Sequence, residues 1–183
     1  MRRWKTPGGP GSPIGHNAPG RCLNQEGFTP MADSVAEQTT INASRDQCLE
    51  VLLDFERYPE WARDLKEATV LARDAQGRGV EVRFRAAGMG YSTRYTLAYD
   101  HSDPDRLAWR LVKGDITRKL DGYYRFTPDS DADAGGNGPI EVAYVLDAEL
   151  ILPLPGFIKR RTELKIVHTA LRELKARVEG GQT

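Results

Sequence analysis

The last part of the chain carries an apolar pattern with the period of a helix. Between residues 155 and 179, apolar side chains recur every three or four positions, which places them on one face of a helix of about six turns. Gly180 and Gly181 follow, as glycine often does where a helix ends. A stripe of this length needs a large apolar partner. Its expected members are Leu164, Val167, Leu171, Leu174 and Val178.

The expected partner is a series of segments in which apolar and polar residues alternate, as they do in half-buried strands. One such segment contains Thr39 and Ile41, and the others follow between residues 68 and 150, separated by turn sequences. Gly114-Asp115 has the composition of a two-residue hairpin turn. The sequence therefore predicts an α+β fold, with an antiparallel sheet of about seven strands wrapped around one C-terminal helix.

Two short helices are expected after the first strand. Ser44 and Gln47 have the spacing of a capping box, which marks the start of the first helix. Pro59 would not be tolerated inside a long helix, so a second short helix or turn is expected over residues 54–61. The aromatic side chains expected to anchor this second segment are Phe55, Tyr58 and Trp61.

Composition favours one globular domain without a global charge. The chain has 183 residues, of which 39% are hydrophobic, and its 26 Lys and Arg balance its 26 Asp and Glu. No positive field is therefore available to recruit nucleic acid. Cys22 and Cys48 form no metal or redox spacing, which fits a reducing cytoplasm. Since no run of about 18 apolar residues could span a membrane, we expect a cytoplasmic protein without a nucleic-acid partner.

Residues 1–30 differ in kind from the rest. They hold six Gly and five Pro with almost no apolar periodicity, which predicts a disordered tail. The folded domain is expected to span residues 31–183. Because strand-like patterning begins just after Met31, the tail is either a natural extension or the product of an upstream start codon.

The order of these elements resembles that of a known family. Three segments carry the resemblance: DFERYPEW at residues 54–61, VLARD at 70–74, and LPLPGF at 152–157 before the final helix. Together they resemble the START-like (SRPBCC) superfamily, and within it the polyketide cyclase/dehydrase and lipid-transport family. Small actinobacterial members and coenzyme Q-binding relatives are similar. The resemblance implies a helix-grip fold, a curved sheet that holds the C-terminal helix over a deep cavity for a hydrophobic or aromatic molecule.

Candidate binding residues are polar and aromatic side chains on strand faces that should turn inward. If Tyr144 faces the cavity, period-two alternation turns a set of other side chains inward as well. Arg118 stands out among them, because a buried charge needs a partner or a polar ligand. It could contact a ligand, pair with a carboxylate such as Glu149, or be turned outward by a β-bulge at Gly122. For the aromatic members, core packing is the alternative. The candidates are Thr93, Tyr95, Trp109, Arg118, Tyr124 and Tyr144.

The start of the final helix supplies a further candidate, Arg160, which continues the apolar stripe with a charge. Lys159, Arg160 and Arg161 lie in a first helical turn, where the helix dipole disfavours positive charge. An anionic ligand head group would explain them. So would a peripheral membrane contact through Leu152 to Arg161, beside the apolar ILPLPGF segment. A solvated, frayed first turn is the alternative.

The sequence contains no HExxH, CxxC, GxSxG or P-loop pattern. The three histidines have no metal or nucleophile partner at useful spacing, so neither a metal nor a cofactor is expected. Binding or transport of a lipid, isoprenoid or polyketide in the cavity is the leading hypothesis. A polyketide aromatase/cyclase or dehydratase, with Arg118 and a tyrosine polarising carbonyls, is the second. A closed module that binds a protein or a ribosome is the third, and a monomer and a homodimer both stay open.

Overall fold

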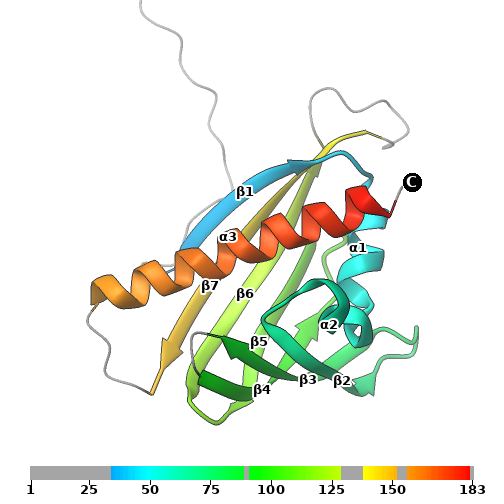
Figure 1. Ribbon diagram of the computed structural model, residues 1–183. Coiled ribbons are helices and arrows are strands. Elements are labelled where there is room, and N and C mark those ends of the chain that lie inside the picture. The colour runs from blue at the N-terminus through cyan, green and yellow to red at the C-terminus, as the bar shows by residue number, and fades with distance from the viewer. Residues whose placement is uncertain (1–33, 89–90, 129–137, 152–155, 182–183) are drawn as a thin grey trace, which may run out of the picture.

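The computed structural model describes residues 34–88, 91–128, 138–151 and 156–181. In this part of the chain, one sheet and three helices form the fold (Figure 1). The strands are β1 (Val35–Ile41), β2 (Leu65–Arg73), β3 (Gly79–Gly88), β4 (Tyr91–Asp100), β5 (Arg106–Gly114), β6 (Thr117–Pro128) and β7 (Ile140–Leu150). The helices are α1 (Arg45–Leu53), α2 (Tyr58–Trp61) and α3 (Gly156–Gly180), with a 3₁₀ turn, η1 (Phe55–Arg57), before α2.

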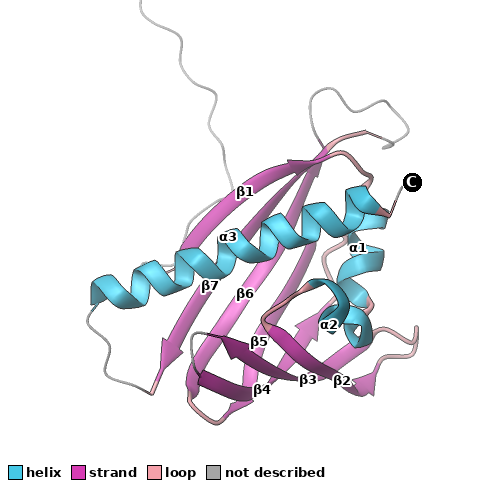
Figure 2. Cartoon of the chain, in the orientation of Figure 1, coloured by secondary structure: helices cyan, strands magenta, loops and turns pink. Residues whose placement is uncertain are grey.

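The sheet is a continuous antiparallel meander from β2 to β7, and β1 returns to pair with β7. The strand order is β1-β7-β6-β5-β4-β3-β2. Helix α3 crosses one face of the curved sheet, and α1 and α2 lie at one end of that face (Figure 2). This arrangement confirms the predicted helix-grip fold, with seven strands in the described residues, two short helices after β1, and one long helix last.

The two short helices form for the reasons expected from the sequence. The Ser44 side chain accepts a hydrogen bond from the Gln47 backbone N–H at the start of α1. The Gln47 side chain accepts one from the Ser44 backbone N–H at 2.9 Å, which completes the capping box. Pro59 lies in the first turn of α2, where its missing N–H costs nothing. The Tyr58 hydroxyl donates to the Leu52 carbonyl oxygen at 2.7 Å and ties the two helices together.

Helix α3 buries most of the predicted stripe, but Leu164 is 42% exposed, so its predicted burial was wrong. The helix runs alongside β1: His168 lies 2.7 Å from Glu37, and Lys175 donates to the Thr40 carbonyl oxygen at 2.6 Å. The turns before His168 therefore reach past the start of β1, as Figure 1 shows. The residues that pack in the core are Val167, Leu171, Leu174 and Val178.

The connection from β5 to β6 is not the predicted two-residue hairpin turn. Gly114 belongs to β5, and the positive φ that such a turn requires is found, among the described glycines, at Gly77 alone. Asp115 instead extends the contact with β4, because its backbone N–H donates to the Arg94 carbonyl oxygen at 3.1 Å. The direct pairing of β5 with β6 ends at Trp109 and Gly122. The two strands then separate, and the Leu111 N–H donates to the Asp121 carboxylate at 2.9 Å.

Candidate functional site

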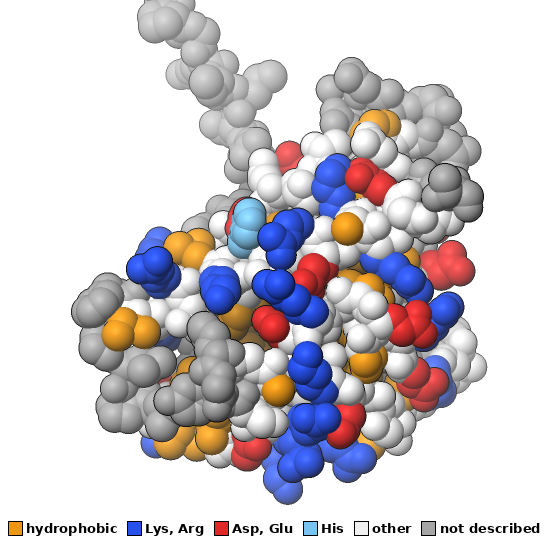
Figure 3. Space-filling model, in the orientation of Figure 1, with side chains coloured by type: hydrophobic (Ala, Val, Ile, Leu, Met, Phe, Trp, Pro, Cys, Tyr) orange, Lys and Arg blue, Asp and Glu red, His pale blue; other side chains and the backbone are white. Residues whose placement is uncertain are grey.

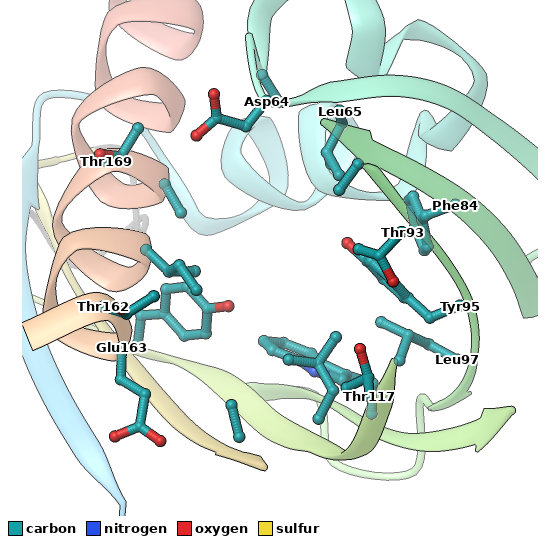
Figure 4. A pocket seen from close by; sticks show the side chains of 18 of the residues that line it. Asp64, Leu65, Phe84, Thr93, Tyr95, Leu97, Thr117, Thr162, Glu163 and Thr169 are labelled. Carbon is teal, nitrogen blue, oxygen red and sulfur yellow. The ribbon is translucent and has the colours of Figure 1, made fainter. Parts of the chain in front are cut away.

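A cavity of about 660 Å³ lies between the inner face of the sheet, α2 and α3 (Figure 4). The wall of the cavity that the sheet forms is aromatic. The ring centroids of Phe84 and Tyr95 stack at 5.6 Å, and those of Tyr124 and Tyr144 lie 4.5 Å apart. Trp109 is 5.4 Å from each of the last two rings. These rings therefore support one another across five neighbouring strands.

Three tyrosine hydroxyls on this wall are available to a ligand. Burial raises the pKa of Tyr95, Tyr124 and Tyr144, so each phenol stays neutral. None of the three hydroxyls bonds to a residue in the part of the chain that the structure describes. Tyr58 differs, because its hydroxyl is already bonded to Leu52. The free hydroxyls can both donate and accept hydrogen bonds inside the cavity.

Threonine hydroxyls add polar groups on both sides of the cavity. Figure 4 shows Thr93 beside Tyr95, with Thr117 below them and Thr169 across the cavity on α3. Thr117 and Thr169 are buried, at 6% and 9% exposure. Their place in the cavity lining gives the apolar interior a few separated polar points.

Glu163 is a buried carboxylate that sequence reasoning missed. Its side chain is 6% exposed and lies 3.8 Å from Lys159. The backbone N–H of Ala148, beyond the last pair between β1 and β7, interacts with this carboxylate, whereas its Oε1 has no hydrogen-bond partner among the described residues. Burial is the main reason that the Glu163 pKa is raised. Figure 4 shows its carboxylate turned away from Tyr95, so Glu163 fastens α3 to the free edge of β7.

The missed residue had a detectable signal. Glu163 stands four positions before Val167, so the helical period places it on the buried face just as well as Leu164. Its i, i+4 spacing from Lys159 also offers an ion pair that makes partial burial tolerable.

Arg118 lies at the edge of the cavity rather than inside it. Its side chain is 63% exposed and 3.9 Å from Glu149, an exposed pair that contributes little to stability. The expectation of a buried arginine was wrong because the β6–β7 register shifts between Thr117 and Lys119, not at Gly122. Thr117 takes the inward position instead.

The structure brings six of the seven candidate residues to one cavity. Arg160 is exposed and is not in the lining. Of the proposed membrane-contact segment, residues 152–155 lie outside the described residues, as do residues 1–30. Among the described residues, no cluster of His, Cys, Asp or Glu could hold a metal ion, and no helix has the length and apolarity to cross a membrane. The candidates that line the cavity are Thr93, Tyr95, Trp109, Arg118, Tyr124 and Tyr144.

A curved antiparallel sheet that holds one long helix over an internal cavity defines the class of helix-grip proteins. The sequence comparison agrees with this class, since residues 32–179 match the family described as polyketide cyclase / dehydrase and lipid transport. The chain belongs to that family. A comparison with proteins of curated function returned no match.

Solved structures with the same fold come from several bacteria. A START superfamily protein from Mycobacterium smegmatis is 24% identical with a TM-score of 0.73, over 80% of this chain and 97% of that one. The Zhui aromatase/cyclase from Streptomyces sp. R1128 is 17% identical with a TM-score of 0.63, over 80% and 93%. A STAR-related lipid transfer protein from Xanthomonas axonopodis is 14% identical with a TM-score of 0.59, over 80% and 85%. At these identities the likeness concerns the fold.

Proposed function

We propose that the protein binds a flat aromatic molecule that carries oxygen substituents, and holds it in the cavity between the sheet and α3. The observation that carries this proposal is the set of three tyrosines that line the cavity, Tyr95, Tyr124 and Tyr144, whose hydroxyls have no partner in the described residues. The family description, which covers polyketide and lipid ligands, supports the same class of molecule.

The hydroxyls argue for a ligand with oxygen atoms. A buried hydroxyl that makes no hydrogen bond costs about 1–3 kcal/mol, so water or a ligand must satisfy it. A plain hydrocarbon chain would leave that cost in place. A ligand with carbonyl or hydroxyl groups at its edge would remove it, and its own polar groups would find partners in an otherwise apolar space.

The ring wall argues for an aromatic ligand. Aromatic pairs contribute about 0.5–1.5 kcal/mol beyond the apolar area that they bury. Phe84, Tyr95, Trp109, Tyr124 and Tyr144 all line the cavity, so a flat ring system has several faces and edges to pack on. The volume of about 660 Å³ lies within the range of about 300–1,000 Å³ that is usual for small-molecule sites.

The test is a fluorescence titration with three probes: a hydroxylated anthraquinone, anthracene and palmitate. The proposal predicts that the anthraquinone binds most tightly. Tyr144→Phe keeps the ring and removes one hydroxyl, so it should weaken the anthraquinone by about two- to tenfold and leave anthracene unchanged. Tyr123→Phe is the control, because Tyr123 lies outside the cavity lining and packs under Arg106. Tighter binding of palmitate than of the anthraquinone would refute the aromatic assignment.

The enzyme hypothesis has less support from the geometry. The described lining residues include no histidine or cysteine, and their one buried carboxylate, Glu163, is turned away from Tyr95 in Figure 4. A cyclisation or dehydration would need a base to remove a proton. The family description and the fold of the aromatase/cyclase remain its support. The closed-module hypothesis is disfavoured by the size of the cavity.

A further inference from the structure

Exposed apolar side chains gather at one end of α3. Six large hydrophobic side chains are exposed in the described part of the chain, and four of them lie between residues 151 and 166. Single exposed hydrophobics are common, whereas a cluster calls for an explanation. The four are Ile151 at 47%, Ile158 at 38%, Leu164 at 42% and Ile166 at 41% exposure.

This cluster borders the cavity. Ile151, at the end of β7, and Ile166, on α3, both belong to the cavity lining. Ile158 stands eight residues before Ile166, a little over two turns away and about 80° around the helix, so the two lie on adjoining parts of its surface. The exposed apolar surface is therefore continuous with the apolar interior of the cavity at this end of the molecule.

The same turns of α3 present only positive charge to solvent. Arg160, Arg161 and Lys165 are exposed and form no ion pair with a described residue. The one acidic residue between residues 156 and 167, Glu163, is buried against β7. Figure 3 shows Lys and Arg side chains lying among apolar ones over α3. The positive end of the helix dipole adds to this local field, although the whole chain has a formal net charge of +0.

We infer that this surface docks on an anionic lipid bilayer and places the edge of the cavity against it. The α3 docking surface is defined by Ile151, Ile158, Ile166, Arg161 and Lys165. Leu164 lies about 160° around the helix from Ile166 and belongs to another side. A helix that lies in a membrane interface presents apolar side chains to the lipid and Lys or Arg beside them. An acidic protein would satisfy the cations but would not require three exposed aliphatic groups. The inference rests on the proposed function, since a hydrophobic ligand of the cavity needs a route from and to a lipid phase.

The test measures co-sedimentation of the full chain with two kinds of vesicle, phosphatidylcholine alone and phosphatidylcholine with phosphatidylglycerol. We expect binding to the anionic vesicles that weakens as salt is added. Each cation near an anionic surface changes partitioning by about fivefold, so Arg161→Gln with Lys165→Gln should weaken binding by about 25-fold. Ile158→Ser should also weaken binding to the anionic vesicles, and the size of this loss should not depend on the salt concentration.

Matched controls exist on the same chain. Arg83→Gln with Arg110→Gln removes two exposed cations from strands β3 and β5, and Leu71→Ser removes an exposed apolar side chain from β2. These variants should bind vesicles as the wild type does. Equal losses in the two double variants would mean that net charge alone matters, and would overturn the docking surface.

The anthraquinone titration on the same variants separates this inference from the proposed function. Ile158, Arg161 and Lys165 are not in the cavity lining, so the variants should keep probe affinity. If the wild type does not co-sediment with anionic vesicles, docking is overturned, whichever molecule the cavity binds. Vesicle binding without probe binding would leave docking in place and remove the proposed ligand.

Discussion

Gly122 is the position where one added methyl group should do most damage. A Cβ atom there would lie 2.7 Å from Cζ2 of Trp109 and closer still to the carbonyl oxygen of Val145. Real Cβ atoms do not approach other atoms so closely. The Val145 carbonyl belongs to the backbone of β7, which is paired with β6. Trp109 is 8% exposed and packs on Tyr124. Neither neighbour can move without shifting the ladder or the cavity wall.

The size of the effect follows from these contacts. Overpacking a well-filled site costs about 1–3 kcal/mol, and the upper end applies here because a backbone atom is involved. Replacing glycine also restricts the unfolded chain, which returns about 0.4–1 kcal/mol. We therefore expect Gly122→Ala to lower the free energy of unfolding by about 2 kcal/mol. For a domain of this size that corresponds to a fall in Tm of about 4–8 °C.

Gly156→Ala is the matched control, because a Cβ atom at Gly156 has nothing within 4 Å. That variant should be as stable as the wild type or slightly more stable. Urea unfolding of both variants, followed by Trp fluorescence, measures the difference. Because the new methyl group also displaces Trp109, Gly122→Ala should weaken the anthraquinone probe as well. A Gly122→Ala midpoint at or above that of the wild type would refute the close packing of β6, β7 and Trp109.

Three further predictions concern the core, the buried carboxylate and the cavity edge. Leu171→Ala should lower the free energy of unfolding by about 2–5 kcal/mol, because Leu171 is only 2% exposed. An unchanged urea midpoint would contradict its place in the core. Because burial raises the Glu163 pKa in the folded state, the wild type should lose stability as pH rises from the ordinary glutamate value of about 4.3 through the folded pKa. Thermal melts across that range should show Glu163→Gln gaining on the wild type with rising pH, and parallel curves would exclude a raised pKa. Arg118→Met should change the free energy of unfolding by less than about 0.5 kcal/mol, since its partner is exposed. In calorimetry, this variant should lose more affinity, relative to the wild type, for an anionic apolar probe than for a neutral one. Equal losses for the two probes would remove Arg118 from the site.

The fold could be predicted because its signals are local. Alternation in β7 places Tyr144 and Leu146 on one face, and both are buried. The capping box at Ser44 and the proline at the start of α2 each act within a few residues. Such features survive in any tertiary context that leaves the segment intact, so they identify the elements in the right order.

The errors arose where position depends on distant neighbours. The helical period allows both Glu163 and Leu164 near the buried face, and the choice depends on where β1 begins beside α3. Nothing within the helix encodes that distance. The predicted inward position of Arg118 was wrong for a similar reason. One extra residue in a strand turns every side chain beyond it to the opposite face of the sheet. The shift between Thr117 and Lys119 is set by the pairing of β6 with β7.

The cavity itself follows from attachment of α3 along one side. His168 and Lys175 tie the helix to β1, and Glu179 accepts from the Asn42 N–H at 2.8 Å in the loop after it. Glu163 adds a tie to β7 at the other end. These contacts hold α3 near the β1–β7 edge of the curved sheet, so Tyr95 on β4 and Trp109 on β5 line the cavity. That space is filled most favourably by a ligand that supplies both rings and hydrogen-bonding oxygens.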